Sequence, residues 1–301
     1  MTTPPRLRLW PFLVAALVAG CEKAPPPAPA APIVARVDHQ PMMPGDSISA
    51  TLQSSSVTAR PPTKELKRLG VFRPVDVQRT VETTFGAKLV ERSTERTRWR
   101  LDFQSFDSVL ETSGSKKAAT DHGLSGTSLI WEKDGETVTV RTDDGKPATK
   151  SQSEVASALI EDLENRDPWG KFFSSREFLQ AKLVEAPKGL FLAGLAEASL
   201  GEIAESHTTV SLFRLGLENE EEVAHFNVNS NMKTELADER YNDVLASGKV
   251  VVRIGDGTLV RYDLDGKVTP RAPTGEMLPT GSGRWTVDFE LAPPRAPADT
   301  R

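Results

Sequence analysis

The stretch TRWRLDF, at Thr97–Phe103, alternates large apolar side chains with polar or charged ones. Successive side chains of an extended chain point to opposite faces, so Trp99, Leu101 and Phe103 share one face. The other face carries only charged side chains, at positions 98, 100 and 102. This pattern predicts a β-strand with one buried face and one face in water.

The same alternation returns in the second half of the chain. In Ala224–Val228 (AHFNV), Phe226 and Val228 alternate with polar side chains, which predicts another half-buried strand. The dipeptides Asp-Gly at positions 134–135, 256–257 and 265–266 each stand between strand-like runs and predict hairpin turns. The acidic run Glu218–Glu222 is expected to join the strands on either side of it.

Two helices are expected in the middle of the chain. Ser153–Arg166 places apolar residues on one stripe, with Ser153 as the expected N-cap and the following Asp-Pro pair as its end. Leu190–Leu200 is rich in Ala and Leu and is followed by Gly201 as the expected C-cap. The predicted fold class is therefore α+β and mainly β. We expect a curved, half-barrel-like antiparallel sheet of hairpins with a few helices on one face.

The N-terminal sequence has the pattern of an export signal, which we expect it to be. Two arginines precede twelve apolar residues at positions 9–20, and this run is too short to span a bilayer, which needs roughly 20 residues. Leu17–Cys21 (LVAGC) resembles the lipobox of bacterial lipoproteins. The resemblance implies cleavage between Gly20 and Cys21 and attachment of diacylglycerol and acyl chains to the Cys21 thiol. The alternative is an ordinary signal peptide that contains a cysteine, but Cys21 is the only cysteine of the chain.

These features divide the chain into four parts. Residues 1–20 are the predicted signal peptide, and residues 21–44 are the lipidated cysteine with a tether that holds seven prolines. Residues 45–291 are predicted to form one β-rich globular domain. Residues 292–301 are a predicted disordered tail.

The composition and motifs point away from catalysis and from nucleic acid. Without the leader the chain has 35 basic residues against 42 acidic ones, whereas nucleic-acid binding favours a basic domain. The sequence GLSG at positions 123–126 lacks the spacing of a serine-hydrolase elbow. His207 and His225 are expected to face each other across a hairpin without forming a zinc site. The sequence Asp263-x-Asp265-Gly266 is expected to be a hairpin turn rather than a calcium loop. We therefore expect a non-catalytic protein with no metal and no cofactor other than the acyl chains on Cys21.

The element order resembles that of the half-barrel lipoproteins of the LolA/LolB and LppX/LprG types, over roughly residues 45–291. This resemblance implies a concave apolar face that binds a lipid or another apolar ligand. The candidate wall residues would be Trp99, Leu101, Phe103, Phe226 and Val228, whose alternative role is a filled core. The second candidate function is an anchored structural or protein-interaction module of the envelope, which would use outer faces such as the basic stripe at positions 92–100.

The resemblance to lipoproteins also predicts the location. The expected place is the cell envelope, where the chain would be held at a membrane by the lipid on Cys21. Glu22 follows the cysteine, and the Asp that retains some lipoproteins at the inner membrane is absent from this position. The outer membrane is therefore favoured over the inner one.

The anchor prediction can be tested by removing the thiol. Cys21→Ser should release the protein from membranes, because the serine hydroxyl does not accept the lipid. The measurement is fractionation followed by carbonate washing. If the variant stayed in the membrane pellet, the predicted anchor would be wrong.

Overall fold

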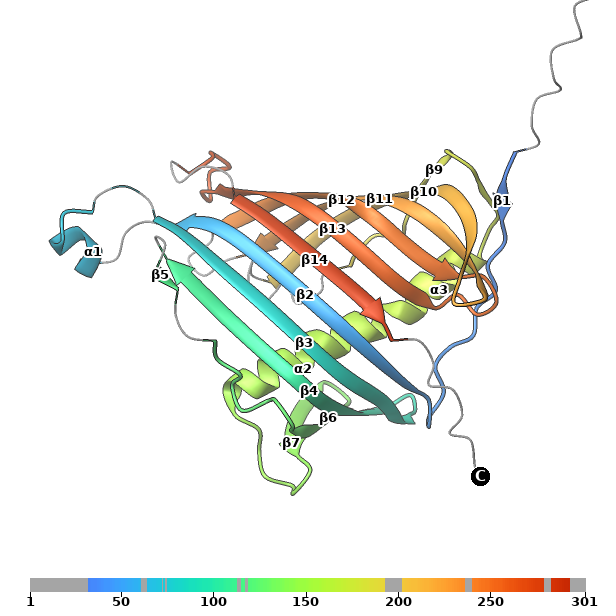
Figure 1. Ribbon diagram of the computed structural model, residues 1–301, viewed down its shortest axis with the longest axis horizontal. Helices are drawn as coiled ribbons and strands as arrows, with labels where there is room; N and C mark the ends of the chain where they lie inside the picture. The colour runs from blue at the N-terminus through green and yellow to red at the C-terminus, as the bar shows by residue number, and fades with distance from the viewer. Residues whose placement is uncertain are drawn as a thin grey trace, which may run out of the picture. The chain divides into compact units, whose positions relative to one another are not determined.

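The computed structural model contains one large antiparallel sheet (Figure 1). It describes residues 32–60, 64–71, 73, 75–112, 115–116, 119–192, 202–235, 240–278 and 283–292. The predicted signal peptide, Cys21 and the tail after Ala292 lie outside the described residues. The description below concerns the unit that begins at Pro32.

Long strands joined by short turns make up most of the sheet. In chain order the strands are β2 (Ser47–Arg60), β3 (Val75–Arg92), β4 (Arg96–Thr112), β5 (Ser115–Lys116), β6 (Ser128–Asp134), β7 (Thr137–Thr142), β9 (Leu183–Glu185), β10 (Glu202–Glu218), β11 (Glu221–Glu235), β12 (Tyr241–Arg253), β13 (Leu259–Arg271) and β14 (Gly283–Leu291). Their order in space is β7-β6-β4-β3-β2-β14-β13-β12-β11-β10-β9, with β5 beside β4. A separate two-stranded sheet pairs β1 (Val34–Ala35) with β8 (Phe178–Leu179).

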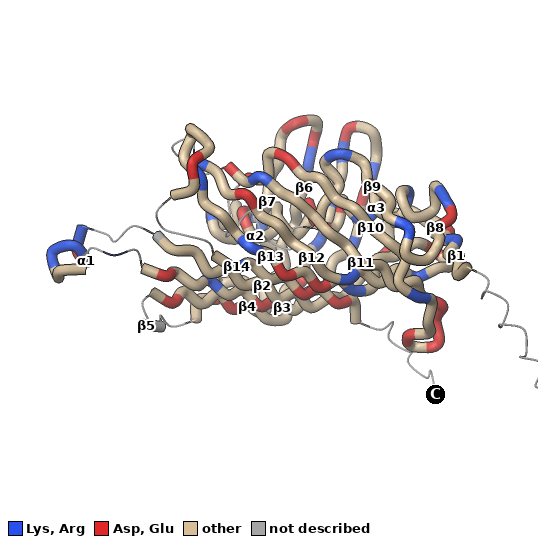
Figure 2. The backbone as a smooth tube through the Cα atoms, turned by 90° about the horizontal axis from the view of Figure 1, so that it is seen from above, with Lys and Arg blue, Asp and Glu red and all other residues tan. Residues whose placement is uncertain are grey.

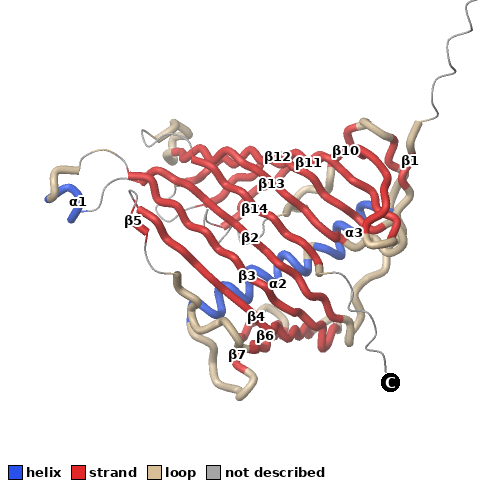
Figure 3. Tube along the Cα trace, in the orientation of Figure 1, coloured by secondary structure: helices blue, strands red, loops and turns tan. Residues whose placement is uncertain are grey.

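The described helices are α1 (Lys64–Arg68), α2 (Lys150–Glu164) and α3 (Arg166–Ser174). Helices α2 and α3 lie against one face of the sheet, whereas α1 projects away from it in the connection between β2 and β3 (Figure 1). Figures 1 and 3 show α2 and α3 following each other across the sheet, and their buried residues belong to the same core as the strands. The predicted fold class, a mainly β protein with an open, curved antiparallel sheet and helices on one face, is confirmed.

The inner face carries the predicted apolar residues. Trp99 and Leu101 are 0% exposed and Phe103 is 2% exposed, while Phe226 and Val228 on β11 are buried in the same core. Burying a side chain of this size contributes about 1.5–3 kcal/mol. Alternating burial along β4 and β11 therefore fixes which side of each strand faces the helices.

Two of the three predicted Asp-Gly turns are confirmed. Gly135 joins β6 to β7 with φ 56°, and Gly257 lies between β12 and β13 with φ 74°. The predicted acidic connection is shorter than the run Glu218–Glu222. Asn219 and Glu220 form the turn between β10 and β11, and both have positive φ. A two-residue turn of this handedness matches the twist of the paired strands.

The third predicted turn is wrong. Asp265 and Gly266 lie inside β13, where Gly266 is paired with Trp285 of β14. A Cβ at position 266 would lie 3.2 Å from a ring atom of Trp285 and 3.3 Å from the Cβ of Ala246. The glycine therefore makes room for the buried indole within a strand.

The helices also begin at places that the sequence pattern missed. The N-cap of α2 is Thr149, whose hydroxyl accepts a hydrogen bond from the Gln152 amide while the Gln152 side chain accepts one from the Thr149 amide. This capping box replaces the predicted cap at Ser153. Pro168 lies in the first turn of α3, where a backbone N–H has no helical partner. Of the second predicted helix, the described residues 190–192 are not helical, and the rest lies outside the described residues.

The predicted tether is packed against the domain from Val34 onward. We call Val34–Met42 the strap. Ala35 and Val37 are 1% and 4% exposed, and the amides of Asp38 and Gln40 donate to the carbonyls of Ile254 and Asp256 at 2.8 and 2.9 Å. The folded unit therefore begins before the predicted boundary at residue 45, because these apolar side chains and backbone groups have partners in it.

Gly248 gives a test of the register between β12 and β13. A Cβ at this position would lie 1.8 Å from the backbone oxygen of Asp263, whereas a Cβ at Gly255 would meet nothing within 4 Å. We expect Gly248→Ala to lower the free energy of unfolding by about 1–3 kcal/mol or more, since the backbone must move. Gly255→Ala is the matched control and should change it by less than about 0.5 kcal/mol. Denaturant titration measures both, and equal midpoints would contradict the register.

Candidate functional site

The predicted wall residues form two separate aromatic groups on the inner face. On β4, Phe103 contacts the rings of Phe85 and Phe106, each at a centroid distance of 6.4 Å. On β11, Phe226 lies 4.6 Å from Phe173 of α3 and 5.0 Å from Phe178. Five strands stand between β4 and β11 in the sheet order. The helices fill the space over these side chains, so the described structure places them in a packed core.

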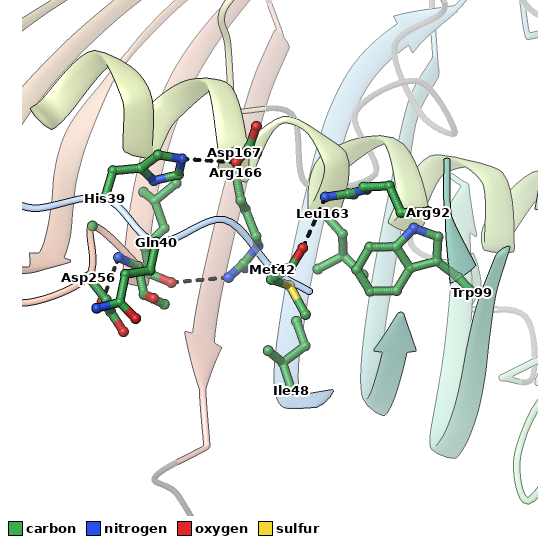
Figure 4. A pocket seen from close by; sticks show the side chains of 13 residues that line it. His39, Gln40, Met42, Ile48, Arg92, Trp99, Leu163, Arg166, Asp167 and Asp256 are labelled. Atoms are coloured by element: carbon green, nitrogen blue, oxygen red, sulfur yellow. Dashed lines mark hydrogen bonds and ion pairs between the residues drawn. The ribbon is translucent and has the colours of Figure 1, made fainter. Parts of the chain in front are cut away.

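A cavity does lie beside one of them, beneath the strap. Its volume is about 70 Å³, and we call it the strap cavity (Figure 4). Its apolar lining comes from the strap, β2, β4, α2 and β13, and consists of Met42, Ile48, Trp99, Leu163 and Leu259. The docked strap therefore adds one wall to a space whose other walls come from the sheet and α2.

Most charged groups around the strap cavity have a partner of opposite charge. The Asp167 carboxylate accepts from Lys171 at 2.6 Å and lies 3.0 Å from the His39 ring nitrogen Nε2. The Asp256 carboxylate accepts from Arg253 at 2.8 Å. Arg92 donates to both oxygens of Glu164 at 2.7 Å. These contacts fix the acids and Arg92 in the wall.

Arg166 is the exception. Its Nη1 donates to the Leu259 carbonyl at 3.1 Å, and its guanidinium lies 4.1 Å from the centre of the Phe289 ring. Its Nε and Nη2 are out of solvent and have no hydrogen-bond partner. Burial lowers the pKa of Arg166, although the negative charge of Asp162 opposes this shift.

A buried hydroxyl lies behind the arginine. The Tyr262 hydroxyl donates to the Asp162 carboxylate at 2.7 Å. Burial, and then the charge of Asp162, raises the pKa of Tyr262 well above its usual value. Tyr262 is therefore a neutral hydrogen-bond donor that holds Asp162 in place between α2 and β13.

A second and larger hollow lies between α2 and the edge strand β7. We call it the α2–β7 groove, and its volume is about 860 Å³. Val138 and Val140 of β7 face Val155 and Ala158 of α2 across it. Polar side chains complete the lining: Arg79, His122, Ser151, Ser153, Glu154, Ser157, Glu161 and Glu202.

The arginines of β4 lie on the outer face, as the alternation predicts. Arg96 and Arg98 both donate to the Glu132 carboxylate, at 2.6 and 2.9 Å, and hydrogen bonds from these arginines lower the pKa of Glu132. Arg100 pairs with Asp102 and Asp143. Figure 2 shows basic and acidic residues interleaved over the strands. The stripe is therefore neutralised by its own neighbours.

The histidines do not form the predicted pair. His207 is paired with Asn231 in the sheet and lies 3.3 Å from Glu185, while His225 is opposite Arg214. Burial lowers the pKa of His225. Within the described residues no group of three metal-ligating side chains is present. The register of β10 and β11 separates the two rings, which corrects the expectation that they face each other.

The GLSG sequence at positions 123–126 is a turn, as expected. The Ser125 hydroxyl accepts from the Phe106 amide at 3.0 Å and lies 3.3 Å from the Phe106 carbonyl. These contacts hold the loop to β4. The serine hydroxyl therefore both accepts from and donates to the backbone of Phe106.

Comparisons with known proteins do not assign the chain to a family. No family model matches, and no curated protein matches its sequence. A search of solved structures found the structure of P47 from Clostridium botulinum A2, with a TM-score of 0.17, 7% identity and coverage of 82% of each chain. A TM-score at this level does not establish a shared fold. Within the described residues no helix has the length and apolar character needed to cross a membrane.

Sequence reasoning found Trp99 but missed the rest of the strap cavity. Gly170 was the available signal, because a glycine inside a short helix indicates a close approach. A Cβ at Gly170 would lie 2.4 Å from Nδ1 of His39. The glycine is therefore what lets the strap pack on α3.

The docking of the strap can be tested with Gly170→Ala. We expect the added methyl group to displace the His39 ring and lower the exchange protection of the Asp38 and Gln40 amides at least about tenfold, or about 1.4 kcal/mol. Hydrogen exchange is the measurement. In a His39→Ala background the same change should have a much smaller effect. Equal effects in both backgrounds would contradict the contact.

Proposed function

We propose that this protein is a lipid-anchored lipoprotein of the bacterial cell envelope whose domain binds an elongated apolar or amphipathic ligand, such as an acyl chain. The role is binding rather than catalysis. The observation that supports it is the α2–β7 groove of about 860 Å³. Binding sites for small molecules occupy roughly 300–1,000 Å³, so the groove has a suitable size.

The lining of the groove suits an amphipathic molecule. Valine side chains of β7 and apolar side chains of α2 offer van der Waals contact along both walls. Arg79, His122 and Glu161 place polar atoms in the same hollow. β7 is an end strand of the described sheet, so no further described strand lies beyond it on that side. In our proposal a long chain enters the groove from this edge of the sheet.

Because the inner core is packed, the proposed ligand contacts other residues than those predicted from the sequence. Trp99, Leu101, Phe103, Phe226 and Val228 are covered by helices, so the proposed ligand does not use them as a wall. Val138, Val140, Val155 and Ala158 take that place. The proposed ligand thus lies at the edge of the sheet instead of its centre.

The anchor and the docked strap of the proposed lipoprotein would hold the domain near a bilayer. In the proposed lipoprotein the chain advances eleven residues from Cys21 to Pro32, which spans at most roughly 40 Å when extended. Residues after Val34 add little reach because the strap is docked. A ligand passing between the membrane, in our proposal the outer membrane, and the groove would travel a short distance.

The alternative function, an anchored structural or interaction module, relied on the basic stripe of β4. The arginines there are paired with Glu132, Asp102 and Asp143. No feature of that surface favours a partner of opposite charge. We therefore propose ligand binding as the function of the domain.

The groove can be tested with a matched pair of substitutions. Val138 lines the groove, whereas its exposed neighbour Thr137 is absent from the lining and belongs to the opposite face of β7. Using the chain with Cys21→Ser, purified without detergent, we expect saturable binding of a fluorescent fatty acid. Val138→Asp should weaken it at least about tenfold, since a charge in an apolar wall costs about 1.4 kcal/mol or more. Thr137→Asp should not change it.

Native mass spectrometry gives an independent readout for the same protein. Co-purified lipid on the parent chain, and less of it on Val138→Asp, would support the proposal. An absence of lipid together with no uptake of the fatty acid would overturn it.

A further inference from the structure

The strap cavity contains Arg166, a cationic side chain that makes no ion pair with the residues that the structure describes. The negative charge of Asp162 acts on it, but the Asp162 carboxylate is bound by the Tyr262 hydroxyl. By contrast, Arg92, Lys171 and Arg253 around the same cavity each have an ion pair. Burying an unpaired charge is unfavourable unless another group compensates it. Arg166 is therefore suited to an anion that enters the cavity.

The geometry of the guanidinium restricts which anion fits. Nη1 is occupied by the Leu259 carbonyl, and the flat face lies over Phe289. The two donors without partners, Nε and Nη2, lie on the same edge of the guanidinium. Their N–H bonds are parallel, which matches the two oxygens of a carboxylate. Figure 4 shows this side chain extending from the helix toward Met42.

The neighbouring charges permit an anion at this edge. Asp167 and Asp256 line the cavity, but Lys171 and Arg253 bind their carboxylates. Glu164 is bound by Arg92 and by the Trp99 indole at 2.5 Å. Nδ1 of His39 lies against Gly170. None of these acids is within ion-pair distance of Arg166 in the described structure.

The remaining surface of the cavity sets the size and character of the ligand. Met42, Ile48, Leu163 and Leu259 present apolar atoms, and the Trp99 side chain lines the same space. A volume of about 70 Å³ accommodates a small molecule. An ion with no apolar part would leave this lining without contacts.

We propose that the strap cavity binds a small monocarboxylate with a short aliphatic body. The carboxylate accepts from Nε and Nη2 of Arg166, and the aliphatic part packs against Trp99 and Leu163. The strap forms one wall through Met42, so binding also stabilises the docked strap. The inference does not depend on the lipid anchor or on the α2–β7 groove.

The test uses the full chain with Cys21→Ser at low ionic strength. Sodium butyrate is the probe, butyramide is the neutral control of the same shape, and sodium chloride at matched ionic strength controls for screening. We expect saturable heat in calorimetry, a change in tryptophan fluorescence and a higher Tm with butyrate. Butyramide should bind at least about tenfold more weakly, because it offers one acceptor and no charge.

Two variants separate the site from general effects on folding. Arg166→Lys keeps the charge but removes the parallel donors, so we expect at least about tenfold weaker binding. Met42→Trp keeps Arg166 and fills the cavity from the strap, so we expect no binding. Circular dichroism establishes that each variant is folded. If Arg166→Lys fails to fold, the Met42→Trp result decides.

The proposal is overturned if butyrate gives no saturable signal, if butyramide binds equally well, or if Met42→Trp retains binding. Val138→Asp, which alters the α2–β7 groove, should leave butyrate binding unchanged. The failure of one site is therefore distinguishable from the failure of the other.

Discussion

The antiparallel pairing of β2 with β14 is the contact on which the rest of the structure depends. It joins residues 50–57 to residues 284–291, so almost the whole domain lies within the loop that this pairing closes. Without it the sheet would be two separate groups of hairpins, one on each side. Trp285 and Phe289 of β14 belong to the core, and Phe289 supports Arg166. Contacts with such a large sequence separation cost loop-closure entropy and form slowly.

Local signals in the sequence predicted much of the sheet. The alternation around Trp99 and Phe226 identified the inner face, and the Asp-Gly pairs before β7 and β13 identified real turns. The same dipeptide at Gly266 was misleading, because its glycine is required by Trp285, which is 19 residues away in sequence. A turn signal depends on neighbours in the chain, whereas this glycine depends on a neighbour in the next strand.

The candidate sites were much harder to predict, for a physical reason. Arg166 stands in the polar run Glu164–Asp167, which is typical of a solvated helix end. Its burial comes from Leu259 and Phe289, and from the strap. The strap itself was predicted as a spacer because prolines surround it, although Val34–Val37 carries an apolar alternation that fits a strand. The valines of the α2–β7 groove are ordinary strand residues, and only the position of α2 makes them a wall.

The docked strap also determines how the domain would respond to mechanical force. A pull on the chain before Pro32 acts first on the pairing of β1 with β8, and then on the bonds from Asp38 and Gln40 to the turn after β12. The long pairings of the main sheet are outside this line of force. Tension would therefore peel the strap away and open the strap cavity while the sheet stays intact. In a domain held in this way, the contacts of the strap would break first under load, before the pairings of the main sheet.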